Sequence, residues 1–432
     1  MEKILFYLLV FCLPFQTRKI VYQWGGDFNE WTSIYLYLTD ILLVLILLSW
    51  LWRNRRERFF KNSLNVQIIK SPNFWLAAFL LISLISLIQA DNIQLGAYQW
   101  IKLLELTALF FYCKYNFKSL FNFERLAHVF VLSGFIQSII AISQFVNQKS
   151  LGLRFLFESP LGPEISGVAK IVNNNFKMIR AYGTFPHPNI LAAFLLISIF
   201  FFYFIWLNKK HSFAFNLLLI IVYGILIIAL GFTFSRTIIF IFLISSIFYF
   251  IVCFRQNRKK IFALFLLFII LCSSFLFLAW PEISNRFQIS LTEQSIGLRS
   301  FYAQISFLVI QEHPWLGMGI GNFVWEIRQM LDLLSSWVHQ PVHNIYLLIG
   351  SEVGLIGLVM FLMFLFILIR QFREQKEENI KQYYLLLFLI SGILIISLFD
   401  HFFWTLQQGQ LMFWLILGII ASQIYQKKET LG

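Results

Sequence analysis

The chain of 432 residues is dominated by long apolar segments that alternate with shorter polar connections. A membrane-spanning helix needs about 20 consecutive, mostly apolar residues, and about twelve segments of the chain meet this need or come close to it. We place them at 4–16, 32–52, 72–89, 94–113, 125–147, 188–207, 213–234, 237–254, 261–280, 344–369, 382–399 and 402–425. The pattern predicts an all-α, polytopic membrane protein with about twelve transmembrane helices. The first segment lacks a signal-peptide cleavage pattern, so we expect it to be retained.

Composition supports the same class. Hydrophobic residues make up 59% of the chain and charged residues only 13%, and phenylalanine alone occurs 52 times. The mean hydropathy of +0.75 lies far above that of soluble domains. These values exclude a soluble protein.

The positive charges are distributed unevenly between the two sets of alternating connections. One set carries 22 Lys and Arg residues and the other carries 11. Cytoplasmic loops are enriched in Lys and Arg, so we expect both termini in the cytoplasm. The net charge of +13 is then mainly a consequence of topology, and no nucleic-acid partner is needed to explain it.

Two connections on the predicted outer side are long, 148–187 and 281–343. Loops of this length in a compact domain are usually functional or have structure of their own. The second loop, between spans 9 and 10, contains amphipathic stretches at 297–310 and 323–334. We expect a helix at the membrane interface from the first stretch, with the apolar positions Ile305, Leu308 and Val309 on one face.

A break follows the first amphipathic stretch. Pro314 should end the helix. The glycines Gly317, Gly319 and Gly321 should then allow the backbone to approach a neighbour closely. On the predicted outer side, most polar residues lie in the two long loops, because the other outer connections are short.

Four polar residues stand out because they lie at the edges of apolar segments on the side that the charge bias depletes: Arg180, Arg236, Arg299 and His343. Cations retained against this bias suggest a site for an anionic ligand. A lone arginine at a helix end more often extends to lipid headgroups. The four residues together are therefore stronger evidence for a binding site than any one of them alone.

Metal and redox chemistry find no support in the sequence. The four cysteines are expected to be apolar packing residues in or beside spans. There is no DxD, HExxH, P-loop or GxSxG motif, and the outer acidic residues are scattered. We expect no metal and no cofactor.

Several short motifs occur in a particular order. They are RAYGTFPHPN at 180–189, FSRT at 234–237, GLR at 297–299, HPWLGMGIGN at 313–322, and HNIY at 343–346 followed by SEVGLIG at 351–357. In this order they resemble the O-antigen ligase/polymerase superfamily of bacterial membrane glycosyltransferases. The resemblance covers roughly 180–400, about half of the chain. We therefore divide the chain into a five-span region, 1–147, and an O-antigen ligase-like catalytic region, 148–432.

The resemblance implies a metal-independent transfer of a glycan from undecaprenyl diphosphate to an acceptor hydroxyl at the outer leaflet of the bacterial inner membrane. It implies that His343 is the general base and that Arg236 and Arg299 neutralise the diphosphate. Substrate contacts are expected from Arg180, Asn344 and Tyr346. The acceptor stays open among lipid A–core, a polysaccharide and a protein.

Other functions and roles are also open. A polysaccharide polymerase or a protein O-oligosaccharyltransferase would share the motifs, and a lipid-linked oligosaccharide transporter would also need outer cations. His187 and His313, each before a proline, are interpreted as turn residues. His339 is a rival base, and Asp400-His401 lies where it could reach the site.

Charged residues also occur within the predicted spans. Lys102 and Glu105 should form an ion pair. Asp40 and Glu352 are embedded acids whose partners the sequence does not reveal.

Overall fold

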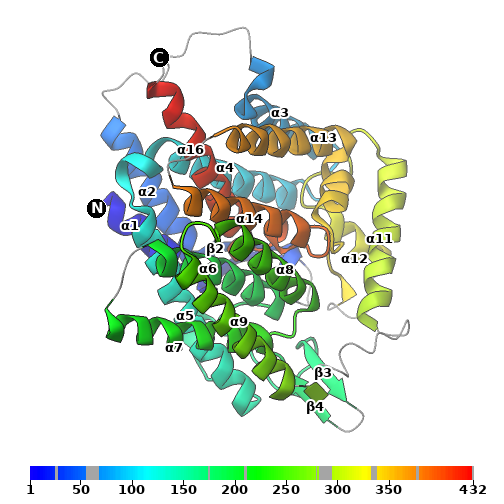
Figure 1. Ribbon diagram of the computed structural model, residues 1–432. Helices are drawn as coiled ribbons and strands as arrows, with labels where there is room; N and C mark the ends of the chain where they lie inside the picture. The colour runs from blue at the N-terminus through cyan, green and yellow to red at the C-terminus, as the bar shows by residue number, and fades with distance from the viewer. Residues whose placement is uncertain are drawn as a thin grey trace.

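The computed structural model describes residues 1–24, 28–54, 68–173, 176–208, 212–278, 280–281, 294–331, 338–375 and 379–430. This part of the chain is mostly helical, which confirms the predicted all-α membrane class (Figure 1). The helices are α1 (Glu2–Cys12), α2 (Leu38–Asn54), α3 (Pro72–Ile85), α4 (Ile93–Leu120), α5 (Phe123–Asn147), α6 (Pro188–Asn208), α7 (Phe213–Phe232), α8 (Arg236–Cys253), α9 (Arg258–Leu278), α11 (Gln294–Glu312), α12 (Phe323–Met330), α13 (Ile345–Arg373), α14 (Ile380–Ile396), α15 (Phe402–Thr405) and α16 (Gln407–Thr430).

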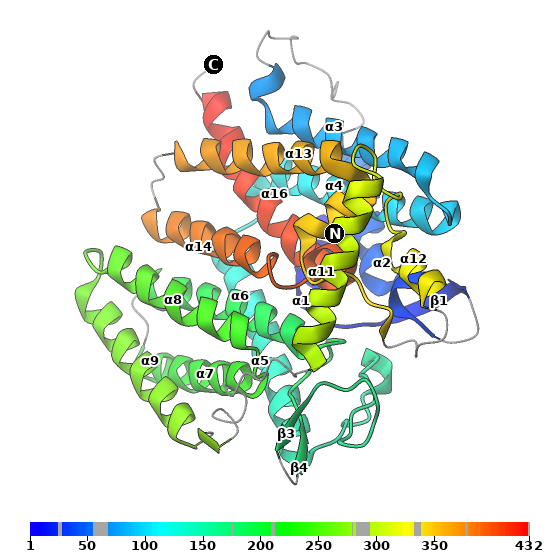
Figure 2. The same cartoon turned by 90° about the vertical axis from the view of Figure 1, so that its right-hand side faces the viewer.

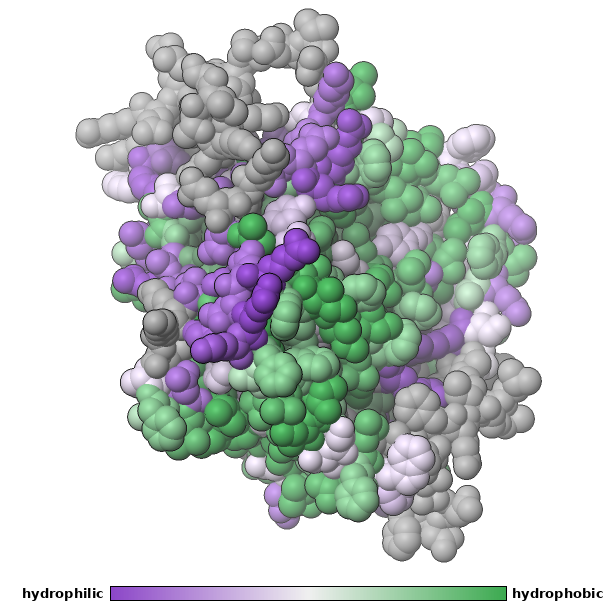
Figure 3. All heavy atoms as spheres, in the orientation of Figure 1, coloured by the Kyte–Doolittle hydropathy of each residue, from purple (hydrophilic) through white to green (hydrophobic). Residues whose placement is uncertain are grey.

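Eight helices of the described part are long and apolar enough to cross a membrane. Of the other predicted spans, α1 has 11 residues, α2 and α14 have 17 each, and α4 is long but carries four Lys and Glu residues. The protein is therefore polytopic, and the count of twelve stays a prediction. Figure 3 shows apolar side chains in a broad band across one face, with polar residues on both sides of the band.

The core is built around α6 and α16. The apolar stretch of α6 is completely buried and that of α16 almost completely. A helix that is apolar on all sides has to be surrounded by other elements or by lipid. Here α5, α7 and α14 pack against α6, and α4 packs along α16.

The structure contains two β-hairpins that the apolar pattern did not predict. The strands β1 (Arg18–Gln23) and β2 (Ser33–Tyr37) pair antiparallel, as do β3 (Lys170–Asn173) and β4 (Phe176–Ile179). The prediction of one helix over 32–52 was wrong at its start, because Ser33, Tyr35 and Tyr37 are buried alternately along β2. Alternating burial with period two is typical of a strand. The alternation covers only five residues here, so it does not stand out within the long apolar segment.

The helix α11 confirms that the second long loop contains a helix, and its place at the membrane interface stays a prediction. It spans Gln294–Glu312, and in both ribbon views it stands across the direction of α13 and α14 (Figures 1 and 2). Tyr302, Ser306 and Val309 are buried, whereas Leu308 is 57% exposed. The expected shared face of Leu308 and Val309 was therefore wrong. The second amphipathic stretch forms α12, and 332–337 lies outside the described residues.

The glycine-rich segment after α11 fits into a break in α13. Gly354 interrupts that helix with φ 76° and ψ 176°. Across the break, Leu355 N donates to Pro314 O at 2.8 Å and Met318 N donates to Ser351 O at 2.9 Å. A Cβ on Gly354 would lie 2.2 Å from the Trp315 carbonyl oxygen. The predicted close backbone approach is therefore confirmed, and its partner is α13.

An ion network joins α2, α4 and α16. Lys102 Nζ lies 2.8 Å from Glu105 Oε2, which confirms the predicted pair, and 2.6 Å from Asp40 Oδ1. Gln407 Nε2 also donates to Asp40 Oδ1, at 2.5 Å. Buried charges require such partners, so the network supplies the partner of Asp40 that the sequence did not reveal.

The orientation in the membrane can be tested by labelling single cysteines, after the four native cysteines are replaced. Ser166 lies in the 148–187 connection, Gln256 lies between α8 and α9, and both are exposed. Because Lys and Arg are concentrated on the cytoplasmic side, we expect a membrane-impermeant maleimide to label Ser166→Cys in intact cells. Gln256→Cys should react only after the membrane is ruptured. The reverse pattern would contradict the predicted orientation.

Candidate active site

Arg180 is a buried arginine that connects two inter-helix turns. It follows β4 directly and is 5% exposed. Its Nε donates to the carbonyl of Thr233 at 2.5 Å, and its Nη2 donates to Asn189 Oδ1 at 2.8 Å. Thr233 lies between α7 and α8, and Asn189 lies in the first turn of α6. The guanidinium is therefore fixed where the ends of three helices meet.

The hydrogen bonds continue from Asn189 to the connection between α14 and α15. Asn189 Nδ2 donates to Asp400 Oδ2 at 2.7 Å, and the backbone N–H of His401 donates to Asp400 Oδ1 at 2.9 Å. Asn189 thus bridges Arg180 and Asp400. Both carboxylate oxygens of Asp400 have partners, as a buried carboxylate requires.

Two histidines lie next to each other at the end of this chain of contacts. The ring centroids of His343 and His401 are 5.0 Å apart in an edge-on arrangement. The ring of Tyr302, from α11, stacks on His343 with a centroid distance of 6.2 Å. His401 Nδ1 is 2.7 Å from Thr405 Oγ1. Burial lowers the pKa of His343, and the nearby Pro341 backbone opposes this shift. Nδ1 of His343 has no hydrogen-bond partner among the described residues.

The electrostatics of this cluster keep the imidazoles neutral. Burial is the main cause that lowers the pKa of His343 to about 4; Asp400 opposes this shift and Arg299 adds to it. Burial likewise lowers the pKa of His401 and that of His187 to about 3. At neutral pH each ring therefore has one nitrogen that can accept a proton.

Asp400 is the negative charge of the cluster. Burial alone would raise its pKa, but the charges of His401, His343 and Arg299 outweigh burial and hold the pKa at about 2. Since the histidines are neutral at pH 7, Arg299 is the cation among these three that faces the ionised Asp400 under those conditions.

The two remaining predicted cations are Arg299, in the first turns of α11, and Arg236, at the start of α8. Arg299 is on α11, three residues before Tyr302, and its charge acts on His343. Arg236 is the first residue of α8 and is half-buried. It follows a tight reversal in which Phe234 has φ 45°, and it lies three residues from Thr233, which accepts from Arg180. The positive end of the α8 dipole is at this turn.

Two predicted substrate-binding residues are occupied in holding helices together. Asn344 caps α13, because its Oδ1 accepts from Tyr346 N and Leu347 N, and its Nδ2 donates to Leu398 O at 3.2 Å. The Tyr346 hydroxyl donates to Leu394 O on α14 at 3.0 Å. These contacts place α13 and its preceding His343 against α14. Direct substrate contact by either residue stays a prediction.

The other histidines are arranged differently. His187 is a turn residue at the start of α6, as expected, because its Nδ1 accepts from Asn189 N at 3.2 Å and its carbonyl oxygen accepts from Ile190 N. The charges of Arg180 and Asp400 also act on its ring. His313 is exposed. His339 is buried and its Nε2 lies 2.9 Å from Leu331 O.

Asn189, Tyr302 and Thr233 are residues of the cluster that the sequence did not point to. Asp400-His401 was noted only because of its place at a span end. No group of three or more His, Cys, Asp or Glu residues in the described part of the chain could hold a metal ion. The cluster combines an anchored cation, an ionised acid and neutral imidazoles, and it can bind an anion and accept a proton.

Comparison with known proteins identifies a family for part of the chain. Residues 221–362 match the family model described as O-antigen ligase. The matched segment contains Arg236, Arg299 and His343, whereas Arg180 and Asp400-His401 lie outside it. No curated protein matches the chain. The predicted resemblance to the O-antigen ligase superfamily is thus confirmed over residues 221–362, a part of the chain that contains the start of α13 and all of α8.

Proposed function

We propose that this protein is a membrane glycosyltransferase that moves a glycan from undecaprenyl diphosphate to an acceptor hydroxyl at the outer leaflet. The observation that carries the proposal is the neutral His343 beside Arg299 in a buried cluster that also contains Asp400. A diphosphate requires cations, an acceptor hydroxyl requires a proton acceptor, and this cluster offers both.

The reaction follows from the roles of these groups. The acceptor oxygen forms a bond to the anomeric carbon of the glycan while the bond from that carbon to the diphosphate oxygen breaks. The electron pair of the broken bond remains on the diphosphate, and the acceptor proton passes to a ring nitrogen of His343. Arg236 and Arg299 stabilise the charge that develops on the diphosphate, because a guanidinium can bind two phosphate oxygens at once.

Arg180 and Asp400 have positioning roles in this scheme. The Arg180 side chain donates to Thr233 and Asn189 of the protein itself, so it contributes positive potential from a fixed place. The charge of Asp400 opposes the lowering of the His343 pKa and would stabilise the imidazolium that forms on proton transfer. A third group that supports the base is a common device in transfer enzymes.

Ligase is the branch we propose, and a polysaccharide polymerase or a protein O-oligosaccharyltransferase would differ from it only in the acceptor. A deletion strain tests the proposal in the cell. Mass analysis of its envelope should show glycans retained on undecaprenyl diphosphate and absent from their acceptor. A deletion strain with complete acceptor glycosylation would contradict it.

Transfer should persist when divalent cations are removed. The described residues hold no cluster of metal ligands, and in the proposed scheme the arginines meet the charge of the diphosphate. We expect purified protein with a lipid-linked donor to keep its rate in EDTA. Loss of activity that added Mg²⁺ or Mn²⁺ restores would show that the arginine scheme is incomplete.

The pH profile should differ between free and donor-bound protein. Protonation inactivates a base, so the rate falls as pH drops through the His343 pKa of about 4 in the free protein; kcat/KM for the donor reports this value. Bound diphosphate offsets the Arg299 charge, which raises the pKa, so the fall in kcat should occur at higher pH. His313→Ala, at an exposed histidine, should leave both profiles unchanged. A fall in kcat/KM at the ordinary histidine value of about 6.5 would contradict the buried placement of His343.

A further inference from the structure

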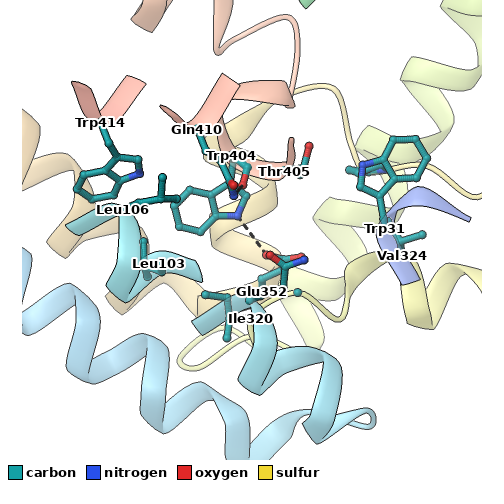
Figure 4. A pocket seen from close by; sticks show the side chains of 13 residues that line it. Trp31, Leu103, Leu106, Ile320, Val324, Glu352, Trp404, Thr405, Gln410 and Trp414 are labelled. Atoms are coloured by element: carbon teal, nitrogen blue, oxygen red, sulfur yellow. Dashed lines mark hydrogen bonds between the residues drawn. The ribbon is translucent and has the colours of Figure 1, made fainter. Parts of the chain in front are cut away.

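A cavity lies close to His401, because Thr405, one of its lining residues, contacts that histidine. Figure 4 shows the side chains that line the cavity. It is enclosed by α4, α12, α13, α15 and α16, with Trp31 and the glycine-rich segment completing its wall. The cluster described above does not use this cavity. Its lining therefore requires an explanation of its own.

The lining combines aromatic faces with a few polar groups. Trp31, Trp404 and Trp414 supply the aromatic rings. Glu352 is the one charged side chain of the lining in the described part of the chain, and its Oε2 accepts from Trp404 Nε1 at 3.3 Å. The two side chains point toward each other in Figure 4. The backbone of Gly321 also faces the Glu352 carboxylate.

Further polar side chains complete the lining. Gln99, Gln410 and Thr405 each contribute an amide or a hydroxyl group. Pockets of this kind, mostly apolar with a small number of placed polar groups, are typical of small-molecule sites.

The cavity is linked directly to the histidine pair. Thr405, which lines it, lies 2.7 Å from His401 Nδ1 through its hydroxyl oxygen. Trp31, on its other side, meets the His401 ring edge-on at 5.7 Å. Pro341 also lines the cavity and precedes His343 by two residues. A molecule held in the cavity would therefore lie next to the proposed base.

We propose that this cavity binds a neutral sugar unit of the acceptor, an inference that rests on the proposed function. A diphosphate does not suit it, because the described lining contains an acid, Glu352, and no Lys or Arg. A lipid chain does not suit it either, since hydrocarbon offers no hydrogen bond to the amide groups of Gln99 and Gln410 or to the remaining lone pairs of Glu352. A sugar has C–H faces that can lie on tryptophan rings and hydroxyls that Glu352 and the glutamines can bind.

The position also favours the acceptor over the donor. The donor sugar is joined to the diphosphate and is held by the arginines, whereas the acceptor has to present a hydroxyl to the histidine pair. Anionic donor and neutral acceptor would thus occupy two parts of one site, with His343 and His401 between the cations and Glu352.

Photolabelling tests occupancy without requiring transfer. A diazirine derivative of N-acetylglucosamine and a diazirine derivative of decanol are applied separately to the full chain in nanodiscs. We expect the sugar probe to label peptides that contain Trp31 or Trp404, and unmodified N-acetylglucosamine to compete. Labelling of these peptides by the decanol probe alone, or by neither probe, would overturn the proposal.

Kinetics then assign the sugar to the acceptor. Glu352→Gln keeps the shape of the side chain but removes its charge, so the KM for acceptor should rise about 10-fold, as expected when a charge-assisted hydrogen bond becomes a neutral one. The KM for donor should be unchanged. Trp31→Leu should shift the KM for acceptor in the same direction. Glu312→Gln and Trp315→Phe, at exposed positions outside the cavity, serve as matched controls.

The two proposals fail in different ways. A rise in the KM for donor with that for acceptor unchanged would overturn the acceptor assignment while transfer itself stands. Absence of transfer by the unmodified protein would overturn the proposed function, whatever the sugar probe labels.

Discussion

Replacing His343 with alanine is expected to reduce glycan transfer by about 10²–10⁴-fold, the usual effect of losing a general base. Donor affinity should be nearly unchanged, because a base that acts on the acceptor contributes little to holding a diphosphate. The measurement is the transfer rate together with donor binding, in nanodiscs. His313→Ala, at an exposed histidine before Pro314, is the matched control and should transfer normally.

Near-normal transfer by His343→Ala would refute the assignment of the base. His401 would then be the first residue to replace, because its ring lies 5.0 Å from that of His343. His339 would follow, although its Nε2 already has a partner in Leu331 O.

Replacing Arg299 with alanine should weaken donor binding and also reduce turnover, since the guanidinium meets the diphosphate in both the ground state and the transition state. Loss of a charge-assisted hydrogen bond of about 1.5–3 kcal/mol corresponds to about 10- to 100-fold in affinity. Arg236→Ala should behave in the same way. Lysine at either position should restore only part of the loss, because an ammonium keeps the charge without the two-point contact.

Arg370→Ala is the control for these variants, since Arg370 is exposed near the far end of α13 and makes a surface pair with Glu374. If Arg299→Ala and Arg236→Ala bind donor as tightly as the unmodified protein, the diphosphate is bound elsewhere. Arg180→Ala should instead lower the stability of the protein, because this buried residue joins Thr233 to Asn189.

The sequence predicts the helices well because each long span requires a long apolar segment, and most bounds agree within a few residues. It could not predict the strand β2, because a five-residue alternation has little weight inside an apolar run. The kink of α13 was also out of reach. Gly354 takes φ 76° only because the segment around Pro314 packs into the break, and that packing is a tertiary contact.

The candidate site was predictable where a residue type is unusual for its place. Arginines on the side depleted of cations, and a histidine before a span, are such cases. The contact between Asn189 and Asp400 was not predictable, because 211 positions separate the two residues. Asp400 had been noted only for its place at the end of a span, and Asn189 only as part of the motif at 180–189. The sequence also did not reveal that the Asn344 side chain caps α13, and substrate contact by this residue stays a prediction.

We propose above all that the protein cleaves the bond between a glycan and a lipid diphosphate and passes the glycan to a hydroxyl. The most direct test uses purified protein in nanodiscs, with undecaprenyl diphosphate that carries a radiolabelled glycan and with a hydroxyl-bearing acceptor. We predict that labelled acceptor and free undecaprenyl diphosphate form in equal amounts, and that Arg299→Ala and His343→Ala suppress both. Recovery of the intact lipid-linked glycan, whether or not it has crossed the bilayer, would contradict the claim.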